Sequence, residues 1–369
     1  MAIERMAVFL PKRWLVGAGS PVRLVLSGLR ALNRLRASFL LPSRSAGLRF
    51  ATYRVIHQIN YQFVEPRFLL GYKLTPLSSI KVAYARMNQP LHLVTNPGFG
   101  IPVDLWFPAN GPIKPQQSDQ VSVAYSRDMV VGATHQLELS VEGYYKKMSN
   151  IVAYRDGHSS QDFTMLSQGS SRRWEAVVTT GQGTAYGAEV FLQKKQGRLT
   201  GWLGYTVSWT IHQFDELNQG KPFAARQDRR HDVSVVGIYP ISKRWSINGT
   251  WIYQTGQPVT LPQAVYGQVN VNIFTNRLDP YGGVLFTYGE RNSYRMKATH
   301  RLDVSIQRKT THKWGVGQLE LSMYNAYNRK NPYFYYLALG NTVKAVSLFQ
   351  IIPSLSYTFN IYTGKKPTE

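Results

Sequence analysis

The chain has 369 residues, of which 43% are hydrophobic and 13% aromatic, and its formal net charge is +23. It contains no cysteine, which excludes disulfides, thiol nucleophiles and thiolate metal sites. No run approaches the roughly 18 apolar residues that a membrane helix needs, so helical spanning is excluded. The aromatic content is compatible with strands that cross a bilayer between two aromatic girdles.

Residues 1–61 differ in composition from the rest of the chain. The first 60 residues hold ten Lys and Arg against one acid, Glu4, which gives 10 − 1 = +9, and they show no sustained period of two or 3.6. Residues 1–14 lack the uninterrupted apolar core of a secretory signal. We therefore predict that residues 1–61 are an atypical basic segment that contributes nothing to the fold. The segment is either non-native, from a shifted reading frame or a misplaced start, or it is disordered or helical.

From about residue 62 onward, apolar and polar residues alternate with period two. Leu203, Tyr205 and Val207 share one face of a predicted strand, while Thr206 and Ser208 share the other. The same alternation recurs at 245–254, 302–307 and 354–361. These runs are commonly about ten to fifteen residues long, whereas soluble strands have a mode of about five or six. A tilted strand needs about nine to eleven residues to cross a bilayer, so the pattern favours membrane strands.

Short turns alternate with long loops along this region. The short turns lie near 75–78, 127–129, 194–198, 240–244 and 309–313, and the long loops lie near 88–115, 149–182, 214–226 and 256–296, with a shorter one near 338–343. Outer-membrane barrels have short periplasmic turns and longer external loops. The predicted strands are 64–74, 78–87, 116–128, 131–148, 183–195, 198–213, 227–239, 242–255, 297–309, 314–337 and 344–361.

The sequence therefore predicts an all-β fold, an antiparallel transmembrane β-barrel with about eleven strands at residues 62–361, followed by a polar tail at 362–369. A single-chain bacterial barrel has an even number of strands. The odd count predicts that the chain is cut in mid-barrel.

Five segments resemble the region past the middle of the barrel in Bacteroidetes-type TonB-dependent receptors, and they occur in the expected order. The resemblance covers roughly residues 62–361. The segments are SSIKVAYARMNQPLHLVTNPGFGIPVDLWFPANGPIKPQQSDQ, TAYGAEVFLQKKQGRLTGWLGYTVSWT, GKPFAARQDRRHDVSVVGIYPISKRWSINGTWIYQTGQPVTLP, NAYNRKNPYFYYLALG and IIPSLSYTFNI.

The resemblance implies the carboxy-terminal half of a plugged barrel of about 22 strands in the cell outer membrane. It implies as partners outer-membrane lipid, a missing amino-terminal barrel half with its plug, and TonB, which would bind through the missing part. The function implied is binding of an unidentified solute at extracellular loops and its import, without catalysis. The alternative is a passive outer-membrane barrel, either porin-like or an adhesion or binding protein, which shares the strand pattern but needs no plug. A departure from the family is the ten residues that follow Phe359.

Charged clusters offer little chemistry. His231 beside Asp232 suggests a catalytic dyad, but adjacent strand residues point to opposite faces, so we interpret residues 226–232 as structural. Glu138 and Glu142 share one strand face and are expected to be solvated or paired in the barrel lumen.

No enzyme signature emerges from the sequence. The glycines of 182–187 precede no helix that would open a phosphate site, the eight histidines show no metal-ligand spacing with a carboxylate, and no Ser/His/Asn constellation of an outer-membrane enzyme is found. The basic charge is divided among turns, loops and the amino-terminal block, which argues against nucleic acid as a partner. We therefore predict no catalytic residues, no metal and no cofactor.

Aromatic residues in the long loops are the candidate ligand contacts, because aromatic faces in loops on a rigid scaffold stack on solutes. The alternative is that they pack the loops together or belong to the outer girdle. The four that we predict to bind ligand are Trp106, Trp174, Tyr281 and Tyr288.

Overall fold

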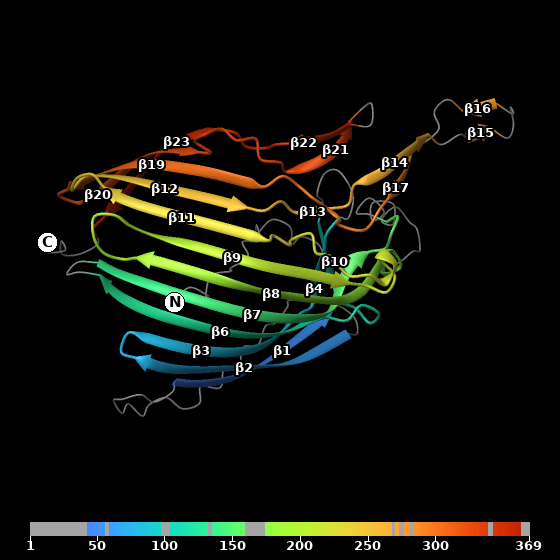
Figure 1. Ribbon diagram of the computed structural model, residues 1–369, viewed down its shortest axis with the longest axis horizontal. Helices are drawn as coiled ribbons and strands as arrows, with labels where there is room; N and C mark the ends of the chain where they lie inside the picture. Colours follow the sequence, from blue (N-terminus) through green and yellow to red (C-terminus); the bar gives the residue numbers. More distant parts are fainter. Residues whose placement is uncertain are drawn as a thin grey trace.

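The structure is a computed structural model, and it describes residues 43–55, 59–96, 104–131, 135–158, 174–267, 270–272, 277–279, 284–338 and 342–362. One curved antiparallel sheet dominates it (Figure 1). The sheet has 13 strands, with twelve in the order β1-β2-β3-β6-β7-β8-β9-β11-β12-β19-β20-β23 and β10 paired separately with β9. Its strands are β1 (Ser43–Val55), β2 (Ile59–Thr75), β3 (Ser78–Gln89), β6 (Gln116–Val131), β7 (His135–Tyr154), β8 (Val178–Lys194), β9 (Thr200–Gln213), β10 (Phe223–Ala224), β11 (His231–Pro240), β12 (Trp245–Gln254), β19 (Thr299–His312), β20 (Gly315–Tyr324) and β23 (Ile352–Ile361).

The remaining elements are small hairpins in the long connections. They pair β4 (Leu91–Val94) with β5 (Leu105–Pro108), β13 (Pro258–Val259) with β18 (Tyr294–Arg295), β14 (Pro262–Gly267) with β17 (Val284–Tyr288), β15 (Asn270–Asn272) with β16 (Arg277–Asp279), and β21 (Phe334–Ala338) with β22 (Thr342–Val346). Two short 3₁₀ helices, η1 (Trp174–Val177) and η2 (Asn218–Gly220), complete the described elements. Within the described residues, no helix has the length and apolar character to cross a membrane.

The short turns and the long connections lie at opposite ends of the sheet (Figure 1). The turns that join β2 to β3, β8 to β9, β11 to β12 and β19 to β20 gather at one end, here called the short-turn end. The hairpins β4–β5 and β14–β17 lie at the other, the long-loop end. The alternation of short and long connections predicted from the sequence is therefore confirmed.

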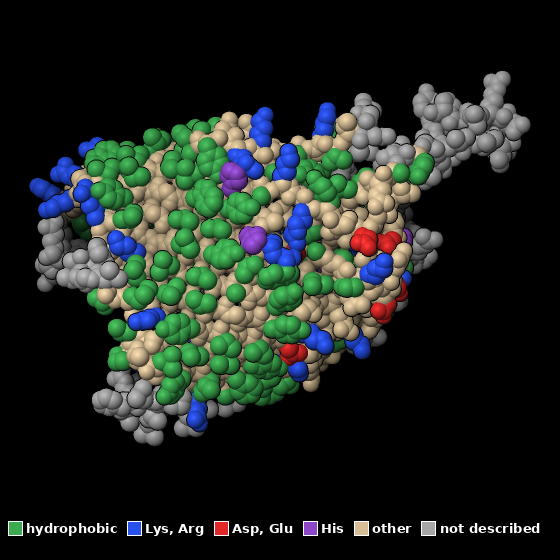
Figure 2. All heavy atoms as spheres, viewed as in Figure 1, with side chains coloured by type: hydrophobic (Ala, Val, Ile, Leu, Met, Phe, Trp, Pro, Cys, Tyr) green, Lys and Arg blue, Asp and Glu red, His purple; other side chains and the backbone are tan. Residues whose placement is uncertain are grey.

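Strand register sorts side chains onto two unlike faces. Tyr205 lies opposite Val190 on β8 and Val233 on β11, so apolar side chains meet across three strands. The next residue of β9, Thr206, lies on the other face, opposite Glu189 and Asp232. Figure 2 shows hydrophobic side chains spread over the sheet, with Lys and Arg scattered at both of its ends and between them. Leu355 is 70% and Tyr357 61% exposed, as expected for side chains that face lipid.

The boundary at residue 61 is wrong for part of the amino-terminal segment. Residues 43–55 form β1, which pairs with β2 from Ser43↔Gly71 to Val55↔Ile59. Arg44 and Arg54 lie on the same face of this strand as Leu48, which interrupts the alternation and hides the strand from a period-two search. Arg49, on the other face, lies opposite Glu65 and forms an ion pair with it at 3.3 Å (Nη1 to Oε2). Residues 1–42 lie outside the described residues.

All eleven predicted spans correspond to strands of the main sheet, and the all-β antiparallel fold is confirmed. Two spans were too long, because 314–337 contains β20 and most of β21, and 344–361 contains part of β22 and the whole of β23. With β1, twelve strands follow one another, so the argument from an odd number does not hold. Among the described residues, β1 pairs only with β2 and β23 only with β20, and the sheet is not closed.

Candidate functional site

Two apolar clusters support the long-loop end of the sheet. One packs Met148 and Ile151 of β7 against Phe214, Leu217 and Phe223 of the β9–β11 connection. The second cluster consists of Val94, Ile113, Tyr154, Val177 and Val178. Because the main sheet has few other buried apolar residues, most of the described core lies where the long connections meet the strands.

Two arginines tie the long connections to one another. Arg226 donates from Nη1 to the carbonyl of Asn96 at 3.0 Å and lies 3.7 Å from Asp104 Oδ1. Arg291 donates to the Tyr154 carbonyl and from Nη1 to Asp156 Oδ1 at 3.0 Å. Bonds from an arginine fork to carbonyls and carboxylates hold geometry well. Asn292 donates to the Ala224 carbonyl at 2.8 Å and joins the two pairs, so the connections after β3, β7, β9 and β12 form one linked layer, here called the loop layer.

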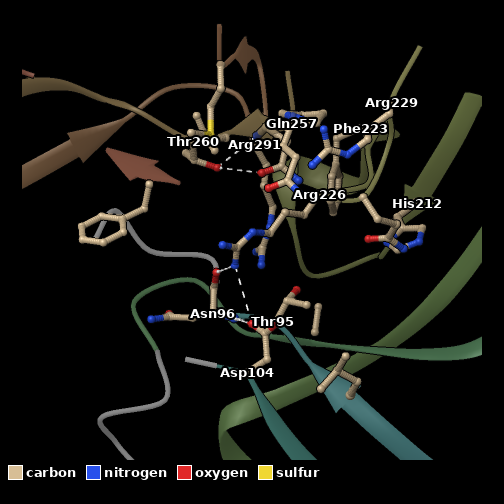
Figure 3. Close-up of a pocket in the computed structure, with 18 of the residues that line it drawn as sticks. Thr95, Asn96, Asp104, His212, Phe223, Arg226, Arg229, Gln257, Thr260 and Arg291 are labelled. Carbon is tan, nitrogen blue, oxygen red and sulfur yellow. Dashed lines mark hydrogen bonds and ion pairs between the residues drawn. The ribbon is translucent and has the colours of Figure 1, made fainter. Parts of the chain in front are cut away.

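A cavity of about 670 Å³ lies within this layer and the adjoining inner face of the sheet. Figure 3 shows Arg226, Arg229 and Arg291 near Gln257 on one side of it, with Asp104 across from Arg226. Apolar groups also line it, among them Phe214, Phe223, Met296 and Tyr335. Its size falls in the range of about 300–1,000 Å³ typical of small-molecule sites.

Burial shapes the charges that line the cavity. Burial lowers the pKa of the Arg291 guanidinium, and Asp156 opposes this effect. Burial also lowers the pKa of Arg229. Both remain cations, because a guanidinium loses its proton only at very high pH. Burial lowers the pKa of His92 as well, which favours the neutral ring that contacts the Lys114 carbonyl. The cavity therefore presents arginines as donors and His92 as an uncharged group.

Gly256 lets two connections approach closely at the cavity. A Cβ placed on Gly256 would lie 1.7 Å from the carbonyl oxygen of Met296, which no side chain can satisfy without moving backbone. The Arg295 guanidinium donates to the Gly256 carbonyl at 3.3 Å. Glycine at this position therefore sets the spacing between two walls of the site.

The cluster at residues 226–232 is structural around Asp228, as predicted. Asp228 is 1% exposed, accepts from the Thr210 amide at 2.6 Å, and forms ion pairs with Arg230 and Arg295. Tyr205 and His231 share one face, with Tyr205 Oη 3.0 Å from His231 Nδ1.

Within the described residues, neither His231 with Asp232 nor Glu138 with Glu142 forms a catalytic pair. Asp232 faces the other way from His231 and accepts from Gln254. Glu138 pairs with Lys195, whereas Glu142 lies directly opposite Glu189 on the inner face. Among the described residues, no group of three or more His, Asp or Glu could hold a metal ion.

Two of the four predicted ligand aromatics lie outside the cavity. Trp106 on β5 is 58% exposed and Tyr288 on β17 is 51% exposed, and neither lines it. Trp174 begins η1, and Tyr281 lies outside the described residues.

Sequence reasoning missed the residues that do line the cavity, including Arg291, Gln257 and His92. No local sequence signal marks them, because they come from connections that are far apart along the chain.

Comparison with known proteins defines the class. A family model described as TonB dependent receptor-like, beta-barrel, matches residues 43–328. The chain therefore belongs to the TonB-dependent receptor β-barrel family, whose members are outer-membrane transporters rather than enzymes, and its location is the outer membrane. The match begins at the first residue of β1, in agreement with the corrected boundary. No curated protein matches the chain.

Solved structures match most of this chain but less than half of their own length. The ferripyoverdine receptor of Pseudomonas aeruginosa is 11% identical, with a TM-score of 0.48, and the match covers 87% of this chain and 37% of that one. The FrpB iron transporter from Neisseria meningitidis is 13% identical, with a TM-score of 0.48 and coverages of 87% and 42%. The ferric-catecholate import receptor Fiu from K12 E. coli is 12% identical, with a TM-score of 0.40 and coverages of 86% and 40%. The chain thus spans about two-fifths of their length.

Proposed function

We propose that this chain is the carboxy-terminal part of the barrel of a receptor that binds a solute on the external side of the outer membrane and imports it when TonB acts on a plug. The observation that carries the proposal is the family match over residues 43–328. The cavity among the long connections supports it, because binding sites are concave and lie on loops held by a rigid scaffold. In this orientation, the short-turn end faces the periplasm. Receptors of Bacteroidetes type remain the proposed subgroup.

The inner face of the sheet favours a plugged barrel over the passive alternative. Glu142 and Glu189 lie directly opposite each other on β7 and β8, and Lys146 is on the same face of β7. Two neighbouring carboxylates repel each other unless a cation lies between them. A basic side chain of a plug domain would satisfy the pair, whereas an open pore offers only water and counter-ions.

The exposed aromatics keep a proposed part in this function. Trp106 and Tyr288 are exposed on hairpins of the long-loop end, where a solute would arrive first. We propose that they make the first stacking contacts before the solute enters the cavity.

The test compares a strain that produces the receptor with a strain that lacks it. Both are grown in the same medium, and the solutes removed from the medium are measured by mass spectrometry, with and without an uncoupler of the proton gradient. We expect at least one solute to be depleted only by the receptor-producing strain and only while the gradient is intact. Depletion that persists with the uncoupler would favour a passive barrel, and no difference between the strains would contradict import.

A further inference from the structure

The cavity carries an excess of positive charge. Among the residues that the structure describes, its charged lining consists of Arg226, Arg229, Arg291, Lys297 and the single carboxylate Asp104. Asp156 adds one further acid, through its ion pair with Arg291. Four cations and two carboxylates leave 4 − 2 = +2.

Two of the four cations are already used within the protein. Arg226 faces Asp104 and the Asn96 carbonyl, and Arg291 faces Asp156 and the Tyr154 carbonyl. Arg291 also stacks on the Phe223 ring, with its guanidinium carbon 5.5 Å from the ring centroid. These contacts fix both side chains as supports of the loop layer.

The excess charge therefore resides in Arg229 and Lys297. Arg229 donates to the carbonyl of Thr255 at 3.3 Å, and Lys297 is exposed into the cavity. Over the ranges that the structure describes, neither has a carboxylate within ion-pair distance. Asp232 acts on Arg229 only at longer range and is itself bonded to Gln254.

A half-buried guanidinium with one neutral partner is an unfavourable arrangement, because removing a charge from water costs free energy unless an opposite charge replaces the water. Carboxylates and phosphates match the guanidinium fork in shape and charge. Gln257 and Thr260 add neutral polar groups to the lining of the cavity, and Phe223 and Met296 supply apolar walls. These features suit an anionic group attached to a partly apolar body.

We infer that the solute carries a carboxylate or phosphate group, which binds between Arg229 and Lys297. This inference rests on the proposed function, since it assigns the chemical class of the imported solute. Arg226 and Arg291 position the loop layer and do not supply the charge that the solute neutralises.

The test is equilibrium binding by the receptor purified in detergent from outer membranes, measured by calorimetry at low ionic strength. The probes are citrate, inorganic phosphate and maltose, which distinguish a carboxylate, a phosphate and a neutral polar solute. The variants are Arg229→Gln and Lys297→Gln, and the matched control is Lys309→Gln at the short-turn end. A heat-modifiable band confirms that each variant folds, and Arg229→Lys tests whether charge without the fork is sufficient.

We expect citrate, phosphate or both to bind the unaltered receptor and maltose not to bind. The dissociation constant should rise about tenfold or more in Arg229→Gln and Lys297→Gln, as expected for loss of a charge-assisted hydrogen bond, and stay unchanged in Lys309→Gln. Partial recovery in Arg229→Lys would support the charge assignment. Absence of anion binding, or equal binding by Arg229→Gln and Lys309→Gln, would overturn the inference.

Uptake separates this inference from the proposed function. Anion binding that depends on Arg229, in a receptor that depletes no solute in a gradient-dependent manner, supports the inference and contradicts import. Gradient-dependent uptake of a neutral solute at the same rate by Arg229→Gln and the unaltered receptor supports import and overturns the inference.

Discussion

Thr206 and Val207 are neighbours on β9 but meet opposite environments. Val207 lies opposite Ala188 and His231, on the face that carries the apolar side chains. Thr206 lies opposite Glu189 and Asp232, on the inner face. Both residues are near the middle of the strand, so depth in the membrane is nearly the same for the two. The pair therefore isolates the effect of the face alone.

We predict that Val207→Arg impairs assembly and that Thr206→Arg is tolerated. An arginine that faces lipid near the bilayer midplane costs about 2–4 kcal/mol, whereas an arginine at 206 would lie between two carboxylates. The measurement is the amount of heat-modifiable receptor in outer membranes. Equal amounts for the two variants would contradict the assignment of faces.

Asp228 is the buried acid on which the loop layer depends. It lies between two arginines and accepts a backbone hydrogen bond from β9. Asp228→Ala should lower the free energy of unfolding by about 3 kcal/mol. This value is at the lower end of the cost of breaking a buried ion pair, because the side chains of Arg230 and Arg295 are about a third exposed. Thermal unfolding of the purified receptor measures the effect. Asp215→Ala, at an exposed acid of the same connection, is the control, and an equal loss in both would argue against a special role for Asp228.

At the scale of elements, the β4–β5 hairpin is held through a buried histidine. His92 is 2% exposed, and its Nε2 lies 3.0 Å from the Lys114 carbonyl, to which the neutral ring donates. Burial lowers the pKa of His92 below its ordinary value of 6.5. The neutral form is therefore favoured in the folded hairpin, and the stabilisation is complete above about pH 6.5.

We predict that the hairpin loosens as the pH falls from about 6.5 through the lower pKa that His92 has in the folded hairpin. Protonation favours the open hairpin, because the exposed ring of His92 takes up a proton more readily there. Hydrogen exchange, corrected for the intrinsic pH dependence of exchange, should show reduced protection of residues 91–94 and 105–108 at pH 5 relative to pH 7.5. His92→Gln should remove most of this difference. Protection that is independent of pH in the unaltered receptor would show that His92 does not control the hairpin.

Strands were predictable from the sequence because their side chains alternate over bilayer-crossing lengths, as in β9 and β23. β1 was missed because Arg44 and Arg54 lie on the same strand face as Leu48 and Phe50 and interrupt that pattern. The cavity was not predictable, because its walls depend on contacts between residues far apart in sequence. Arg226 and Asn96, which form one such contact, are 130 residues apart.

At the scale of the whole molecule, the sheet combines an apolar face with a loop layer at one end. The apolar face includes the directly paired Leu70, Val82 and Val123 of β2, β3 and β6, and the directly paired Leu321 and Leu355 of β20 and β23. The loop layer holds the cavity and the linked arginines. A receptor needs both features, because the apolar face anchors the barrel in lipid while the loop layer meets the solute.

The central claim is that this sheet crosses the outer membrane with one face toward lipid and the other toward the lumen. Because the chain has no cysteine, single cysteines can be introduced at positions 203–210 of β9 and spin-labelled without background. The measurement is the accessibility of each label to oxygen, which concentrates in lipid, and to a water-soluble nickel complex. The account predicts period-two alternation of opposite phase, with 203, 205, 207 and 209 accessible to oxygen and 204, 206, 208 and 210 accessible to nickel. Equal accessibility of both sets to nickel, or no alternation, would contradict it.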